Sequence, residues 1–191
     1  MNLPNKLTLF RIFLIPIYMV LMLAPIIKDD IICRIVCVSI FIVASLTDML
    51  DGKIARKYNL VTNFGKLMDP LADKFMVFGA LLAMLVKYDY LQSVFVWAAA
   101  VIMFRELAVS SLRLLAAGKK DPSASWLGKV KTVSQIVMIC AVMLEPVVLP
   151  FPIFTEMHLL SYITIIATIV MTVWSGISYF VSYSKVIDFK N

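Results

Sequence analysis

The chain is organised around two linked segments, Asp48-Met-Leu-Asp51-Gly52-Lys-Ile-Ala55-Arg56 and Gly65-Lys-Leu-Met-Asp69-Pro-Leu-Ala-Asp73. Both lie inside or beside runs apolar enough to enter a lipid bilayer. Their four acids form two pairs, three and four residues apart, so on a helix each pair shares one face. Gly52 and Ala55 project onto the face of the first pair, where a ligand or a facing helix can approach the backbone closely.

Four carboxylates that face one another at low dielectric cannot all stay ionised without positive charge nearby. Either some of them are protonated or a divalent cation lies among them. Ligands that are all oxygen, without His or Cys, favour a hard cation such as Mg²⁺ or Mn²⁺. The alternative is that each Asp belongs to a solvated loop at a helix end. Their helical spacing, with Gly and Arg interposed, favours the metal site.

The composition indicates an integral membrane protein. Of 191 residues, 62% are hydrophobic and 16% are charged, whereas soluble domains have about 45–50% apolar and about 25% charged residues. The length allows one domain covering residues 1–191. The first apolar run contains Arg11 and Pro16 and no small-residue cleavage site, so we expect a retained span and not a signal peptide. The net charge of +6 suits anionic lipids and a phosphate-bearing substrate.

The apolar runs predict an all-α integral membrane protein with six transmembrane helices. A span needs about 20 apolar residues, and open strands cannot cross lipid. Short polar connections with charged residues, Gly or Pro separate the runs. The predicted spans cover residues 7–27, 31–55, 64–86, 91–118, 123–148 and 157–184.

The basic residues are divided unequally between the two sides of the membrane. Only Lys28, Arg34 and Lys87, of 18 Lys and Arg residues, lie in or beside the connections that follow the first, third and fifth spans. Segments rich in Lys and Arg stay in the cytoplasm. Both termini, and the acidic ends of the second and third spans, are therefore predicted to be cytoplasmic. Nucleic-acid binding is disfavoured, because this basic charge lies between membrane spans.

The beginning of the chain carries polar residues at successive threes, Asn5, Thr8 and Arg11. They spread over about 120° of one helix face, from which they could reach phosphate or the edge of a base. The alternative is an amphipathic entry helix that lies in the membrane interface. The residues alone leave both interpretations open.

Basic side chains also occur inside the fourth span, as Arg105 and Arg113, and at the start of the fifth, as Lys129 and Lys131. Charges inside spans are costly and usually functional. For the arginines the alternatives are a structural pair with Glu106 or snorkelling to the surface. For Lys131 the alternative is the positive-inside signal.

The acidic pattern resembles the signature of the CDP-alcohol phosphatidyltransferase family. Its eight fixed residues occur here at the family spacing, Asp48-x2-Asp51-Gly52-x2-Ala55-Arg56-x8-Gly65-x3-Asp69-x3-Asp73. The opening Asn2-Leu-Pro4-Asn5-Lys-Leu-Thr8-Leu-Phe-Arg11 further resembles the bacterial members that form phosphatidylglycerol phosphate. Length and hydrophobic layout match over essentially the whole chain.

The resemblance implies an enzyme that displaces CMP from CDP-diacylglycerol and attaches the phosphatidyl group to an alcohol. It favours sn-glycerol 3-phosphate as this alcohol. It implies one or two Mg²⁺ or Mn²⁺ ions held by Asp48, Asp51, Asp69 and Asp73, and it makes Asp73 the base for the acceptor hydroxyl. It also implies a homodimer in a bacterial cell membrane. The implied CDP-lipid contacts are Asn5, Thr8, Arg11, Asp48, Gly52, Ala55, Arg56, Thr62 and Gly65.

Several alcohols could serve as the acceptor. A dianionic acceptor needs cations, and the basic residues that suit it are Arg105, Arg113, Lys129 and Lys131. Serine, inositol phosphate and phosphatidylglycerol are the alternative acceptors. A cation transporter is the alternative outside enzymes, but transporters place their charges near the midplane and often show repeated halves. Here the acids gather at one side of the membrane.

Overall fold

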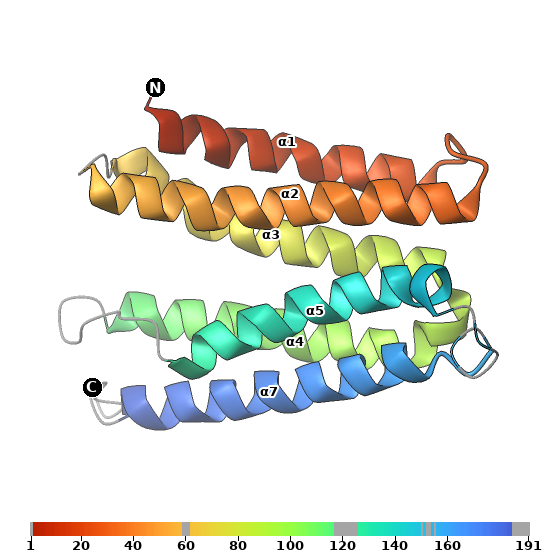
Figure 1. Ribbon diagram of the computed structural model, residues 1–191. Helices are drawn as coiled ribbons and strands as arrows, with labels where there is room; N and C mark the ends of the chain where they lie inside the picture. The colour runs from red at the N-terminus through yellow and green to blue at the C-terminus, as the bar shows by residue number, and fades with distance from the viewer. Residues whose placement is uncertain are drawn as a thin grey trace. The chain divides into compact units, whose positions relative to one another are not determined.

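The computed structural model is built from long helices (Figure 1). It describes residues 2–58, 62–116, 126–149, 151, 154 and 156–184, without the side chain of Arg56. The long helices are α1 (Leu3–Leu23), α2 (Asp30–Lys57), α3 (Asn63–Lys87), α4 (Gln92–Leu115), α5 (Trp126–Val148) and α7 (Leu159–Ser184), and the short 3-10 helix η1 (Asp89–Leu91) precedes α4. The all-α membrane fold predicted from the sequence is confirmed.

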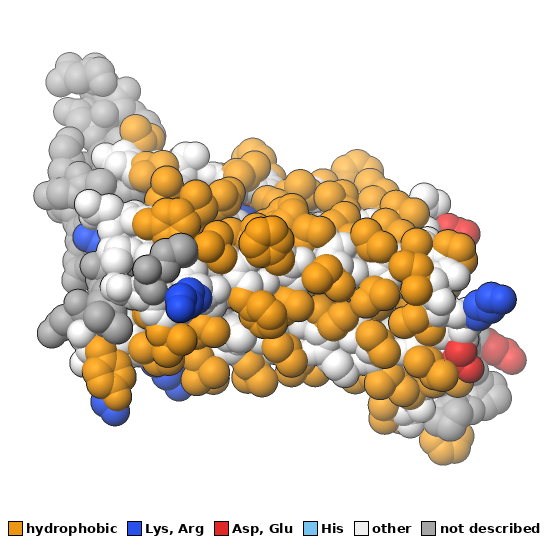
Figure 2. All heavy atoms as spheres, turned by 90° about the horizontal axis from the view of Figure 1, so that it is seen from above, with side chains coloured by type: hydrophobic (Ala, Val, Ile, Leu, Met, Phe, Trp, Pro, Cys, Tyr) orange, Lys and Arg blue, Asp and Glu red, His pale blue; other side chains and the backbone are white. Residues whose placement is uncertain are grey.

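Within the described residues, five helices are long and apolar enough to cross a membrane: α1, most of α2, α4 with η1, α5 and α7. α3 is 25 residues long, but Lys66, Asp69, Asp73 and Lys74 interrupt its apolar sequence. A sixth span and the cytoplasmic position of both termini therefore stay predictions. On the face drawn in Figure 2, hydrophobic side chains cover most of the middle, as contact with lipid requires, and charged side chains gather mainly toward the ends.

The predicted bounds of the first and fourth helices are wrong. The first helix covers Leu3–Leu23 and not 7–27, because Pro4 favours its start and Pro25 ends it. Pro4 occupies the first turn, where its missing N–H does no harm, and Ala24 is extended because a residue before proline avoids the helical region. The fourth helix ends at Leu115, before the predicted 118.

The helices form two compact units, which we describe separately. The first comprises Met1–Gln92 with Pro146–Pro150 and contains α1, α2 and α3. The second comprises Ser93–Glu145 with Phe151–Asn191 and contains α4, α5 and α7. A single domain over residues 1–191 stays a prediction.

In the first unit, α1 packs against both α2 and α3. Tyr18 of α1 meets Phe41 of α2 with ring centroids 6.4 Å apart. On the other side, Ile15 of α1 lies so close to Gly79 of α3 that a Cβ added there would be 2.6 Å from Ile15 Cγ2. Close approach of the two helices therefore depends on glycine at this position.

Replacing Gly79 with Ala should destabilise the first unit by about 1–3 kcal/mol, the usual cost of overpacking. Thermal unfolding of the detergent-solubilised protein measures this change. Ile15→Ala also removes the clashing Cγ2, so the double variant should lose less stability than the sum of the two single variants, as coupled contacts do. Strictly additive losses in the double variant would show that the two helices do not touch at this point.

The end of the first unit away from the acids is held by polar contacts. Asp29 caps α2 by accepting a hydrogen bond from the Ile32 backbone N–H at 3.0 Å. Arg34 Nε donates to Asp30 Oδ2 at 2.6 Å, and its guanidinium lies 4.4 Å from the centre of the Tyr88 ring. These contacts tie the start of α2 to the end of α3.

In the second unit, Glu145 near the end of α5 caps the start of α7. Its carboxylate accepts hydrogen bonds from the Leu160 backbone N–H at 2.7 Å, from the Ser161 backbone N–H at 3.1 Å and from the Ser161 hydroxyl. The first N–H groups of a helix lack partners within the helix and favour an anion. A buried acid is thus used here to join two helices.

Candidate functional site

The predicted acids lie at the facing ends of two helices. Asp48 and Asp51 are in the last turns of α2, and Asp69 and Asp73 are in the first turns of α3. Thr62 starts α3 as its N-cap, because its hydroxyl oxygen accepts a hydrogen bond from the Gly65 backbone N–H at 3.0 Å.

Arg11 of α1 joins three of these acids. Its Nη1 donates to Asp48 Oδ1 at 2.7 Å and to Asp73 Oδ1, and its Nη2 donates to Asp51 Oδ2. The Arg11 side chain is 0% exposed. The three carboxylates therefore converge on one buried guanidinium.

Asp69, the fourth acid, is held by Thr8, which lies on α1 with Arg11. The Thr8 hydroxyl lies 2.6 Å from Asp69 Oδ1 and 3.1 Å from the Pro4 carbonyl oxygen. A hydroxyl has a single proton, and a carboxylate oxygen is a stronger acceptor than a backbone carbonyl oxygen. The Thr8 hydroxyl therefore donates to Asp69. Thr8 thus fixes the position of the Asp69 carboxylate.

Asn5 contacts the start of α3. The Thr62 hydroxyl donates to Asn5 Oδ1 at 3.0 Å, and a Cβ added to Gly65 would lie 3.2 Å from the same oxygen. Glycine at position 65 therefore makes room for Asn5. Asn5, Thr8 and Arg11 are all buried against the acids and α3, so the alternative of an interfacial amphipathic face is wrong for these side chains.

The charge and the donor set fit a divalent cation. Four carboxylates and one guanidinium leave a net negative charge, and every acidic ligand is a hard oxygen donor, which suits Mg²⁺ or Mn²⁺. In the part of the chain that the structure describes, no three acidic, His or Cys side chains are already arranged as ligands. Asp73 and Asp48 side chains are 48% and 37% exposed, against 3% for Asp51, so a ligand can approach the first two.

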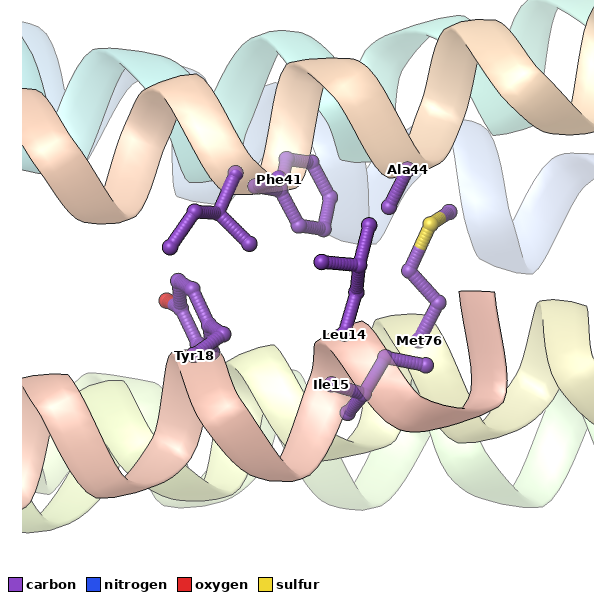
Figure 3. A pocket seen from close by; sticks show the side chains of 7 residues that line it. Leu14, Ile15, Tyr18, Phe41, Ala44 and Met76 are labelled. Atoms are coloured by element: carbon purple, nitrogen blue, oxygen red, sulfur yellow. The ribbon is translucent and has the colours of Figure 1, made fainter. Parts of the chain in front are cut away.

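An apolar pocket adjoins this cluster within the same three helices (Figure 3). Leu14 follows Arg11 by three residues, Ala44 precedes Asp48 by four, and Met76 follows Asp73 by three, so each lies about one helical turn from the charges. Apolar side chains there lower the dielectric on this side of the charges. The pocket is lined by Leu14, Ile15, Tyr18, Ile40, Phe41, Ala44 and Met76.

Three further predicted contacts lie on or near the last turns of α2. Gly52 and Ala55 are partly buried there. The Arg56 side chain lies outside the described part of the chain.

The basic residues predicted to bind the acceptor lie in the second unit. Arg105 Nη2 donates to Ser175 Oγ at 2.7 Å, and Arg113 Nη2 donates to Tyr179 Oη at 2.7 Å. Lys131 is buried and pairs with Glu106, whereas Lys129 is exposed. Arg105 also lies 3.5 Å from Glu106, and both arginines lie against the Tyr179 ring. Helices α4, α5 and α7 therefore bring three of the four basic residues into one polar network.

Sequence reasoning did not predict several of these partners. The spacing predicts that Arg11 faces a ligand and does not indicate its bonds to three carboxylates. Nor does the sequence indicate that Lys131 pairs with Glu106 or that Glu145 caps α7. The one available signal was the buried charge itself, since a charge inside a span needs an opposite charge or a backbone partner.

Comparison with known proteins gives consistent matches. The sequence profile of the CDP-alcohol phosphatidyltransferase family matches residues 1–174. The chain is 44% identical over 190 residues to the CDP-diacylglycerol--glycerol-3-phosphate 3-phosphatidyltransferase of Bacillus subtilis (strain 168), covering 94% of this chain and 93% of that protein. The protein of the same name from Yersinia pestis (strain Pestoides F) is 35% identical over 182 residues, with the same coverage. The one from Rickettsia felis is 45% identical over 136 residues, 71% of each chain.

Proposed function

Because this chain belongs to the CDP-alcohol phosphatidyltransferase family, we propose that it transfers the phosphatidyl group of CDP-diacylglycerol to sn-glycerol 3-phosphate. The products are phosphatidylglycerol phosphate and CMP. The observation that carries the proposal is the 44% identity, over 94% of the chain, to a relative named for this reaction. The convergence of three acids on one point, with a fourth beside them, supports it.

The reaction is a phosphoryl-type transfer. The acceptor hydroxyl oxygen attacks the phosphorus that carries the diacylglycerol, a P–O bond forms, and the P–O bond to CMP breaks. Asp73 takes the hydroxyl proton as general base. The 48% exposed side chain of Asp73 supports this role, since a base must be reachable by the acceptor.

Asp48, Asp51, Asp69 and Asp73 would hold one or two Mg²⁺ or Mn²⁺ ions. When bound, such a cation neutralises charge on the diphosphate. The chain's own part is to fix these acids: Thr8 orients Asp69, and the packing of α1 against α2 and α3 holds the two acidic helix ends together.

The CDP moiety is proposed to bind beside the acids, at the ends of α2 and α3. Gly52 and Ala55 have little side chain, so the cytidine can approach the backbone of α2. Gly65 is also proposed to border the nucleotide at the start of α3, where it makes room for Asn5. The polar side chains proposed to contact the nucleotide and its phosphates are Asn5, Thr8, Arg11, Asp48, Arg56 and Thr62.

The acceptor phosphate is proposed to bind Arg105, Arg113, Lys129 and Lys131. Replacing Arg113 with Ala should raise the KM for glycerol 3-phosphate much more than that for CDP-diacylglycerol. Loss of a charge-assisted bond to phosphate costs roughly 1.5–3 kcal/mol, or about ten- to 150-fold. Steady-state kinetics with each substrate varied in turn measures both constants.

Tyr179→Phe is the matched control for this variant, because it removes the hydroxyl that Arg113 contacts and leaves the arginine and the ring in place. It should change the KM for glycerol 3-phosphate far less than Arg113→Ala does. An equal rise in both KM values for Arg113→Ala would assign a structural role to this arginine.

The protein is proposed to lie in a bacterial cell membrane with its active site on the cytoplasmic face. A cysteine at Tyr58, which is 61% exposed just after α2, should react with an impermeant thiol reagent only from the cytoplasmic side. A cysteine at Met157, 65% exposed before α7, should react only from outside. The reversed pattern would invert the topology and move the acids across the membrane.

A homodimer is proposed on the family resemblance, and light scattering in detergent tests it.

The proposed reaction is tested by CMP release. Purified protein should release CMP when both CDP-diacylglycerol and glycerol 3-phosphate are present, and not with either one alone. Equal release without any acceptor would indicate hydrolysis in place of transfer.

A further inference from the structure

Arg11 is bonded in a way that a purely structural arginine does not require. Its side chain is 0% exposed, yet its two terminal nitrogens bond to three carboxylates from two other helices, those of Asp48, Asp51 and Asp73. These carboxylates would repel one another without a cation between them. The guanidinium is thus the counterion that lets them lie together.

A divalent cation at the proposed site would need the same oxygen atoms. Two cations that share a set of ligands at about 4 Å repel each other, the more so at low dielectric. We propose that Arg11 is an intramolecular counterion, which holds Asp48, Asp51 and Asp73 together in the metal-free protein and competes with the divalent cation for them. This inference rests on the metal site of the proposed function.

The surroundings of Arg11 would allow its guanidinium to release the carboxylates when a cation binds. Its Nε is buried and has no hydrogen-bond partner in the structure, so the three carboxylates are what hold the group in place. The backbone of α1 is held by contacts away from the acids, since Tyr18 packs on Phe41 and Asn5 is bonded to Thr62. A cation can therefore take over the carboxylates without displacing α1.

The two roles predict effects of opposite sign in Arg11→Met, which keeps length and apolar bulk but removes the charge. The metal-free variant should unfold at a lower temperature than the wild type, because three carboxylates lose their counterion. Its affinity for Mn²⁺ should rise at least about tenfold, because a competing positive charge has been removed. A purely structural arginine would lower both stability and affinity.

The experiment uses the full-length protein, purified in detergent and stripped of metal. Electron paramagnetic resonance during Mn²⁺ titration gives the Kd, and thermal unfolding in EDTA gives the metal-free stability. The matched control is Arg34→Met, since Arg34 is a buried arginine of the same unit and pairs with Asp30 at 2.6 Å. This control should lose stability with its Kd for Mn²⁺ unchanged.

Arg11→Lys serves as a second variant if Arg11→Met does not fold. Lysine keeps the charge but has no planar fork to bridge three carboxylates, so its Kd for Mn²⁺ should lie below that of the wild type. An unchanged or weaker Mn²⁺ affinity in the Arg11 variants would overturn the competition while leaving the metal site intact. Absence of Mn²⁺ binding by the wild type would overturn the metal site itself.

Discussion

Replacing Asp73 with Asn should lower the rate of phosphatidyl transfer by about 10²–10⁴-fold, the usual effect of removing a general base. Asparagine keeps the shape of the side chain but cannot take the proton of the acceptor hydroxyl. CDP-diacylglycerol should still bind, because Asp48, Asp51 and Asp69 keep most of the charge that the site offers to a cation. Single-turnover transfer measures the rate, and direct binding of CDP-diacylglycerol is measured separately.

Asp48→Asn is the comparison that separates the base from the metal ligands. Asp48 and Asp73 both accept a hydrogen bond from Arg11 Nη1, so the two variants disturb the Arg11 contacts alike. Asp48→Asn should nevertheless weaken CDP-diacylglycerol binding as well as turnover. Near-normal transfer in Asp73→Asn, or lost turnover with intact binding in Asp48→Asn, would contradict the assigned roles.

Removing divalent metal should abolish the activity, and Mg²⁺ or Mn²⁺ should restore it. A cation that neutralises a diphosphate contributes several kcal/mol to the transition state, which corresponds to about 10³-fold or more in rate. CMP release in the presence of a chelator, before and after adding back each metal, measures the effect. Full activity in the chelated protein would show that the acids serve another purpose.

Much of the site could be predicted from local spacing. A spacing of three or four residues places two side chains on one helix face whatever the rest of the chain does. This spacing separates Asp48 from Asp51 and Asp69 from Asp73. The apolar runs that contain these acids are long enough to require helices. These features depend on near neighbours in sequence, which periodicity describes well.

The contacts of Arg11 could not be predicted in the same way. They join residues 37 to 62 positions apart, and their pairing depends on how three helices pack, which periodicity does not determine. The pairing of Lys131 with Glu106, 25 positions apart, has the same origin. Pro25 ends the first helix earlier than hydrophobicity suggests, because a local backbone preference outweighs the apolar run.

The identity of the lipid product tests the central claim most directly. Purified protein is incubated with CDP-diacylglycerol and a mixture of glycerol 3-phosphate, serine, inositol phosphate and phosphatidylglycerol, and the new lipid is identified by mass spectrometry. Phosphatidylglycerol phosphate, formed in step with CMP, is the predicted product. Phosphatidylserine, phosphatidylinositol phosphate or cardiolipin in its place would contradict the proposed acceptor, and no new lipid at all would contradict the proposed enzyme.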